Sequence, residues 1–144
     1  MLFDWNTIAA PAALLDVHPG MRVADLCAAP GGKTAVMSEM MGDTGRVYAW
    51  DTHAHRVELI RGTMNRLKLE NVRPAVKDAS VPREEMAMTL DAALVDAPCS
   101  GEGMFRKHEE ACSEWSPENV ELCAKRQDSV LDEAAAMLKK GGRL

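Results

Sequence analysis

Hydrophobic positions along the chain alternate between short apolar runs and longer stretches with helical spacing. The apolar runs predict four strands, at 22–26, 46–50, 72–76 and 92–95. Between them, 33–41 and 55–67 are predicted to be helices, each ending where the apolar periodicity stops. Pro74 favours an edge position for the third strand, because proline cannot donate a ladder hydrogen bond. This alternation predicts an α/β fold with a mostly parallel sheet and helices on both faces.

The C-terminal third of the chain predicts one long helix. Residues 116–118 read Ser-Pro-Glu, which suits a helix start: a capping hydroxyl, a proline at the first position and an acid in the first turn. An apolar stripe follows over more than five turns, at Val120, Cys123, Val130, Leu131, Ala134 and Leu138. We expect the glycines at 141–142 to end this helix and residues 143–144 to open a fifth strand. The sequence would then be part of a longer domain.

The composition is typical of a soluble globular domain. The chain has 144 residues, 47% hydrophobic and 27% charged, enough for one domain with a core. No apolar run approaches the roughly 18–20 residues that span a membrane, and the N-terminus lacks the basic leader of a signal peptide, so we expect a cytoplasmic protein. Four cysteines occur with no CxxC pair, and we expect no metal site. A net charge of −5 disfavours tight binding of nucleic acid by these 144 residues alone.

The segment between the first strand and the first helix predicts a ligand-binding loop. Residues 25–34 read DLCAAPGGKT, at the place where doubly wound sheets bind nucleotide-like ligands. Its small residues allow close approach, and the helix start offers unpaired N–H groups. A phosphate-binding P-loop is the least supported interpretation, because Cys27 stands where the first glycine of that motif is required. The G-x-G-x-x-G motif is absent, which disfavours NAD.

Acidic residues stand at or near the carboxyl ends of all four predicted strands, at Asp25, Asp51, Asp78 and Asp96. Asp51 lies 20 positions after Gly31, close to the spacing of a carboxylate that binds ribose hydroxyls, although an aspartate there also suits a helix cap. A cofactor that contains a nucleoside but is not bound through phosphate groups fits these four acids. Because carboxylates suit both adenosine and a cationic sulfonium, S-adenosylmethionine is the best match.

The stretch 95–107, VDAPCSGEGMFRK, brings together an acid, a proline and a thiol directly after the fourth strand. Taken singly, a cysteine is often a small buried hydrophobe, and an aspartate before proline often starts a turn. Their combination at a strand end, followed by a glycine-rich basic segment, predicts a functional site.

The motifs DLCAAPGGKT and DAPCSGEGMFRK together resemble RNA (cytosine-5) methyltransferases of the Sun/NOP type, most of all the bacterial RsmF-like enzymes that act on ribosomal RNA. The resemblance covers about 11–144, including EWSPENVELCAKRQ at 114–127, whereas 1–10 are atypical. It implies a partial catalytic domain over 1–144, with a Rossmann-like S-adenosylmethionine-dependent methyltransferase fold whose last strands lie beyond it. It also implies methylation of cytosine C5 in RNA, ribosomal rather than transfer RNA.

The resemblance assigns roles to individual residues. Those expected around the cofactor are Cys27, Ala28, Ala29, Pro30, Gly31, Gly32 and Lys33 by the methionine part, Asp51 by the ribose, Arg56 nearby, Asp78 by the adenine, and Asp96 between cofactor and base. Arg106 and Lys107 are candidate RNA contacts, with solvated surface charges as the alternative.

The family's reaction uses two cysteines. One thiolate attacks cytosine C6, and a second cysteine, in a Pro-Cys dipeptide, helps to release the adduct. Cys99 matches the second, with Asp96 beside it in the catalytic pocket. The attacking cysteine belongs to a Thr-Cys dipeptide expected beyond Leu144, so we expect these 144 residues to be inactive alone. Cys123, on the apolar stripe, is expected in the core. A non-catalytic cofactor-binding fragment is the alternative function.

Overall fold

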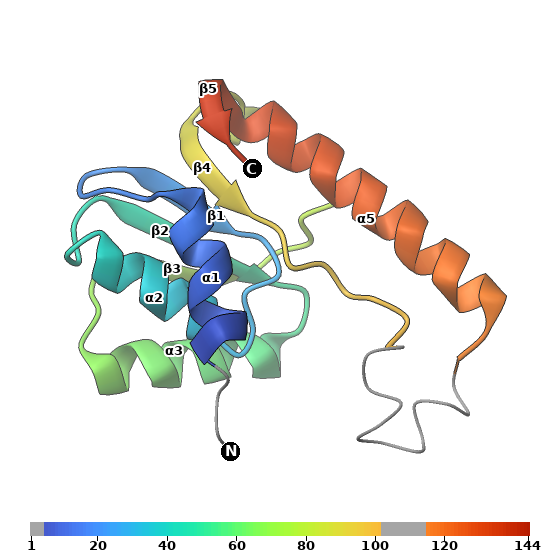
Figure 1. The fold of residues 1–144 in the computed structure, drawn as a ribbon, viewed down its shortest axis with the longest axis horizontal. Helices are drawn as coiled ribbons and strands as arrows, with labels where there is room; N and C mark the ends of the chain where they lie inside the picture. Colours follow the sequence, from blue (N-terminus) through green and yellow to red (C-terminus); the bar gives the residue numbers. More distant parts are fainter. Residues whose placement is uncertain (1–4, 102–114) are drawn as a thin grey trace.

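The computed structural model describes residues 5–101 and 115–144, which form a parallel five-stranded sheet with helices on both faces (Figure 1). The strands are β1 (Arg22–Asp25), β2 (Arg46–Asp51), β3 (Val72–Val76), β4 (Leu90–Leu94) and β5 (Leu138–Arg143), in the order β3-β2-β1-β4-β5. The helices are α1 (Trp5–Leu15), α2 (Gly32–Met40), α3 (Ala54–Leu67) and α5 (Pro117–Met137), with a short 3-10 turn at Glu84–Met86. The α/β prediction is confirmed.

The predicted central elements agree with the structure to within two residues at each end. β3 lies at the edge of the sheet, as Pro74 predicted. Ser116 caps α5 by accepting a hydrogen bond from the Asn119 N–H at 3.2 Å, with Pro117 in the first turn. Local sequence signals therefore place most helix and strand boundaries.

The predicted end of the long helix is wrong. α5 ends at Met137, and the glycines at 141–142 lie inside β5, which runs over six residues instead of opening at 143. The last carbonyls of the helix, those of Ala136 and Met137, accept hydrogen bonds from the N–H groups of residues 88 and 89. The end of the helix is thus set by the loop before β4, a long-range contact that the glycines do not reveal.

The glycines of β5 accompany an irregularity in its pairing. The β4–β5 register shifts between Leu90 and Ala92, and a Cβ at Gly142 would stand 3.1 Å from the Asp91 carbonyl oxygen. Glycine inside a strand commonly marks such a bulge or close backbone approach. Lys139 then ties β5 to β4 through its ammonium, 2.6 Å from Asp91 Oδ1.

Side chains alternate between two cores, one on each face of the sheet. The face under α1, α2 and α3 is formed by Ala12, Leu15, Val17, Val23, Ala28, Ala35, Met37, Met41, Val47, Ala49, Ile60, Met64, Val72, Ala92 and Leu94. The opposite face, under α5 and the 77–89 segment, is formed by Ala24, Leu26, Trp50, Ala79, Met86, Leu90, Ala93, Val130, Ala134 and Met137. Both faces of a parallel sheet are normally covered in this way.

The N-terminal residues from Trp5 form α1, with Pro11 inside it, and Ala12 and Leu15 near the end of this helix are buried. One expectation about packing is corrected by the structure. On α5, burial is confined to the last two turns, at Val130, Ala134 and Met137. Cys123, expected in the core, is only partly buried because the first half of the helix extends past the sheet (Figure 1).

Gly45, between α2 and β2, is a position where only glycine fits. Its φ is +67°, and a Cβ would overlap the Met21 carbonyl oxygen, which already accepts the Arg46 N–H. We expect Gly45→Ala to lower the free energy of unfolding by more than about 2 kcal/mol. Gly62→Ala is the matched control, because Gly62 lies inside α3 with open space at its Cβ, and it should stabilise by about 0.5–1 kcal/mol. Urea unfolding of both variants measures the contrast, and equal effects would contradict it.

Candidate functional site

A cavity of about 320 Å³ lies at the carboxyl edge of the sheet, on both sides of β1. There the strand order reverses: β1 has β2 on one side and β4 on the other, the arrangement that opens a crevice in α/β sheets. The cavity is lined by Leu26, Cys27, Ala29, Asp51, Thr52, Arg56, Asp78, Ala79, Asp96, Ala97, Pro98, Cys99, Arg126 and Val130. Its volume falls in the usual range for small-molecule sites, about 300–1,000 Å³.

A smaller cavity, of about 130 Å³, shares Cys27, Ala29 and Asp96 with the first and reaches Asp25. Asp25 is fully buried at the end of β1. Its Oδ2 accepts the Thr34 hydroxyl at 2.7 Å, but Oδ1 has no hydrogen-bond partner. Burial raises the pKa of Asp25 to about 6, opposed by the Thr34 hydrogen bond and the charge of Lys33. An unpaired buried acceptor beside a cavity suits a donor group on a ligand.

Asp51, the last residue of β2, presents a buried carboxylate to the larger cavity. Its Oδ1 accepts the His53 N–H at 3.1 Å, the contact expected of an aspartate just before a helix. Arg56, in the first turn of α3, places a guanidinium nitrogen 3.5 Å from Oδ2. Asp51 is therefore a turn residue whose carboxylate also lines the cavity, and its role toward a ribose stays a prediction.

Asp78 follows β3 and closes another side of the cavity. Its Oδ1 accepts both the N–H of Ser80, at 2.9 Å, and the Ser80 hydroxyl, at 2.7 Å. These bonds lower the pKa of Asp78, helped by the charges of Arg126 and Arg83. The carboxylate is held ionised and in one orientation.

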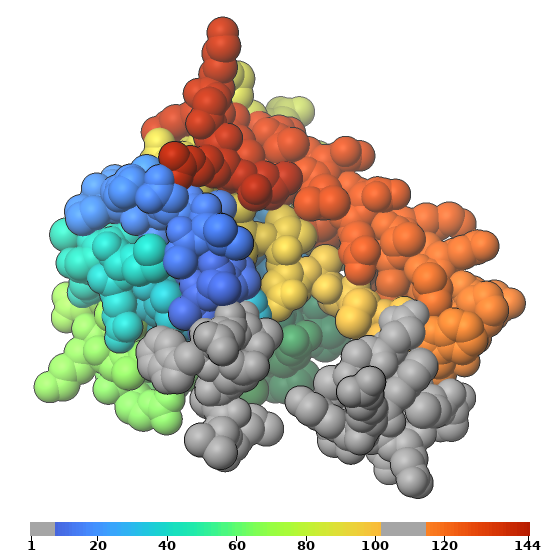
Figure 2. Space-filling model, in the orientation of Figure 1, coloured from blue at the N-terminus to red at the C-terminus, as the bar shows by residue number. Residues whose placement is uncertain are grey.

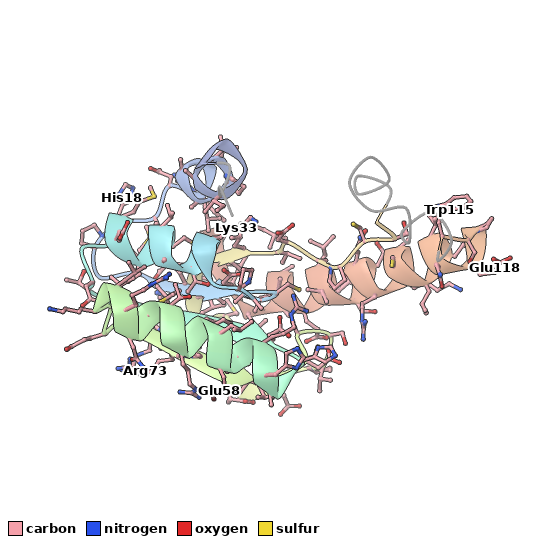
Figure 3. All side chains as sticks on the ribbon, turned by 90° about the horizontal axis from the view of Figure 1, so that it is seen from below. His18, Lys33, Glu58, Arg73, Trp115 and Glu118 are labelled. Carbon is pink, nitrogen blue, oxygen red and sulfur yellow. The ribbon has the colours of Figure 1, made fainter. Side chains whose placement is uncertain are left out.

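Asp96, after β4, pairs with Lys33 at the start of α2. Lys33 Nζ lies 2.8 Å from Asp96 Oδ2, so the ends of the two predicted motifs meet directly. Figure 3 labels Lys33 at the end of α2 nearest this edge. A lysine paired with a carboxylate is a poor substitute for the phosphate-binding lysine of a P-loop, which weighs further against that alternative.

The two cysteines of the cavity differ in environment. Burial, and then the charges of Asp25, Asp51 and Asp96, raise the pKa of Cys27 to about 11. Its thiol stays protonated at neutral pH and is a poor nucleophile. Cys99 lies exposed at the cavity wall. Of the two, Cys99 is the thiol available for chemistry.

The structure brings the predicted cofactor residues together. Those lining the larger cavity are Cys27, Ala29, Asp51, Arg56, Asp78 and Asp96, and those lining the smaller are Ala28, Pro30, Gly32 and Lys33. Gly31, the residue just before α2, has a φ of +102°, a conformation that favours glycine. Arg106 and Lys107 lie outside the described residues. Arg126 was not predicted, although it stands in the 114–127 stretch that carries the resemblance.

The described part of the chain offers neither a metal cluster nor a membrane span. Residues 5–101 and 115–144 contain no group of three or more His, Cys, Asp or Glu side chains placed to hold a metal ion. Within the same ranges, no helix combines the length and the apolar character needed to cross a membrane.

The sheet order and the acids at its carboxyl edge define a Rossmann-like fold, and comparison with solved structures shows that it is the fold of methyltransferases. The crystal structure of an S-adenosylmethionine-dependent O-methyltransferase from Thermotoga maritima superimposes with a TM-score of 0.60 over 88% of this chain and 49% of its own, at 21% identity. At that identity the likeness concerns the fold alone.

Within this class, the chain belongs to the family described as 16S rRNA methyltransferase RsmB/F, which residues 12–144 match. Ribosomal RNA small subunit methyltransferase F of Serratia proteamaculans is 39% identical over 84% of this chain, and that of Escherichia coli K12 is 37% identical over 96%. The chain spans 25% and 29% of their lengths. The NSun6 structure from Pyrococcus horikoshii with SFG has a TM-score of 0.80 at 26% identity, covering 93% of this chain and 34% of that one.

Proposed function

We propose that this chain binds S-adenosylmethionine in the cavity at the carboxyl edge of the sheet. We further propose that it is part of a cytoplasmic enzyme that methylates C5 of cytosine in ribosomal RNA, with residues 11–144 belonging to one catalytic domain. The observation that carries the proposal is the convergence of both family motifs, through Cys27, Asp96 and Cys99, on one cavity that Asp51 and Asp78 also line, in a chain of this family.

The residues present fit the cofactor. Asp51 offers a buried carboxylate suited to ribose hydroxyls, which is the usual role of an acid at this place in the fold. The unpaired Oδ1 of Asp25 offers an acceptor to the amino group of the methionine part. Arg126 and Val130, one turn apart on α5, complete the lining of the cavity. The donor and acceptor set is thus complementary to a cationic nucleoside.

The chain's own residues prepare a site for a base beside the cofactor. When bound, S-adenosylmethionine supplies an electrophilic methyl group. Asp96, held by Lys33, lines the cavity together with Cys27 and Cys99, and we expect the cytosine to enter beside it. A base inside a helix cannot reach this cavity, so the target must be unpaired or flipped out. Cys99 is placed to act on an adduct formed there.

The Thr-Cys dipeptide expected to carry the attack on cytosine C6 does not occur among these 144 residues. None of the four cysteines follows a threonine, and the Cys27 thiol is held protonated. We therefore propose that the 144 residues bind the cofactor without methylating cytosine by themselves. A tritium-transfer assay with ribosomal RNA should show no label in cytosine. Labelled cytosine would overturn this part of the proposal, since Cys99 would then have to supply the attack.

Calorimetry with S-adenosylhomocysteine tests the binding proposal. We expect saturable one-site binding, and no comparable heat from ATP, because Lys33 is engaged with Asp96 and the loop lacks the first P-loop glycine. Binding of ATP that is lost in Lys33→Ala, with none of S-adenosylhomocysteine, would replace the proposal with the nucleotide-hydrolase alternative.

A further inference from the structure

The segment after β4 has no regular secondary structure, yet it carries Asp96 and Cys99. β4 ends at Leu94, and 95–101 run from there toward α5 without joining a helix or strand (Figure 1). In the space-filling view this segment lies between the N-terminal helices and α5 (Figure 2). Its geometry therefore depends on contacts from flanking elements.

Two side chains from opposite helices hold this segment. On the α2 side, Lys33 pairs with Asp96 at 2.8 Å. On the α5 side, Gln127 donates its side-chain N–H to the carbonyl oxygen of Pro98 at 3.0 Å. The two contacts lie within the Asp96–Cys99 tetrad, one at its first residue and one at its third.

We propose that Gln127 is a positioning residue for Cys99. The Pro98 carbonyl belongs to the same peptide plane as the Cys99 N–H and Cα, so holding that oxygen orients the backbone from which the thiol projects. Pro98 has no backbone N–H, so its carbonyl is the only backbone group through which a side chain of α5 can hydrogen-bond to it.

The location of Gln127 on α5 supports a role other than packing. The described burial of α5 begins at Val130, and Trp115 and Glu118 mark the far end of the helix, away from the sheet (Figure 3). Gln127 lies about one turn before Val130, the first buried residue of α5. Its chain neighbour Arg126 and Val130 itself both line the cavity. This turn of α5 therefore contacts both the Asp96–Cys99 tetrad and the cavity. The inference rests on the proposed function and adds to it the residue that orients the Cys99 thiol.

Backbone resonances on either side of the Pro98–Cys99 peptide bond test the inference in the free chain. Gln127→Met keeps the length of the side chain but removes the donor, and we expect the carbonyl-carbon resonance of Pro98 and the amide-nitrogen resonance of Cys99 to shift, because both report hydrogen bonding at the Pro98 carbonyl. Gln127→Lys keeps a donor with sufficient reach and should return both resonances toward their wild-type positions. Lys125→Met, on an exposed position of the same helix, is the matched control and should change nothing. Unchanged resonances in Gln127→Met would overturn the inference.

Alkylation by iodoacetamide separates positioning from cofactor binding. In the wild-type chain S-adenosylhomocysteine should slow labelling of both Cys27 and Cys99, because both line the cavity. In Gln127→Met, protection of Cys27 should persist while that of Cys99 falls roughly two- to tenfold. Equal loss at both cysteines would make Gln127 a general structural residue and overturn the inference. Protection of neither cysteine in the wild type would instead refute the proposed cofactor site, and the backbone resonances of Pro98 and Cys99 would still decide the role of Gln127.

Discussion

Asp51→Ala should weaken binding of S-adenosylhomocysteine roughly 100-fold or more. Asp51 is buried at the end of β2, with its carboxylate on the cavity and oriented by the His53 N–H. A ribose offers two hydroxyl donors, and hydrogen bonds to a charged acceptor contribute about 1.5–3 kcal/mol each. The substitution also leaves the Arg56 guanidinium without its partner at the cavity wall. Titration calorimetry measures the change in Kd.

The control for Asp51→Ala is Glu58→Ala, an exposed acid on α3 that pairs with Arg61 and does not line the cavity. It removes the same charge and should leave the Kd within about twofold. Far-UV circular dichroism and the unfolding midpoint of both variants establish that the fold is intact. An unchanged Kd in a folded Asp51→Ala chain would refute the assignment of the ribose to this end of the cavity.

The free energy of unfolding should fall as pH rises from about 4 to above 6, because Asp25 loses its proton in the folded chain over this range. Burial raises its folded-state pKa from 3.8 to about 6, so the folded state holds the proton more tightly than the unfolded state does. The stabilising effect of that proton is complete below the unfolded pKa and is lost as pH rises through the folded pKa. A shift of this size corresponds to about 3 kcal/mol. Asp25→Asn keeps an acceptor for the Thr34 hydroxyl but does not ionise, and it should therefore lack this loss.

Urea unfolding of wild type and Asp25→Asn between pH 4 and 7.5 measures this difference directly. Because all other titrating groups are common to both chains, the gap between their unfolding free energies isolates Asp25. We expect the unfolding free energy of Asp25→Asn, relative to that of the wild type, to rise by about 2 kcal/mol across this window, because part of the full effect is already lost at pH 4. Parallel curves would show that Asp25 is not desolvated as the structure places it. S-adenosylhomocysteine should bind more weakly to Asp25→Asn, since its amino group loses an anionic acceptor.

Sequence reasoning works well here where the signal is local. The order of strands and helices, the edge position marked by Pro74 and the cap at Ser116 each depend on residues close together in the chain. The acids could be placed at one rim because each follows its own strand, and parallel strands end at the same edge. The resemblance supplied the chemistry that these positions alone did not.

What the sequence could not supply depends on long-range contacts. The end of α5 is determined by hydrogen bonds from residues 88 and 89, some fifty positions earlier, so Gly141 and Gly142 were misinterpreted as a helix stop. The partial exposure of Cys123 follows from how far α5 extends past the sheet, which periodicity does not encode. Gln127 carries no local signature of its bond to Pro98, 29 residues away.

The position of β4 beside β1 has a consequence for synthesis of the chain. β1 neighbours β2 and β4, but Leu90 follows Asp25 by 65 positions, and α5 comes later still. At ordinary translation rates the β1 loop waits on the order of seconds before β4 can join it. Until then the nascent chain has Cys27 and Asp51 but lacks Asp96, Cys99 and Arg126. The cofactor therefore cannot act as a template for early folding, and its stabilising effect reaches only chains whose sheet is already assembled.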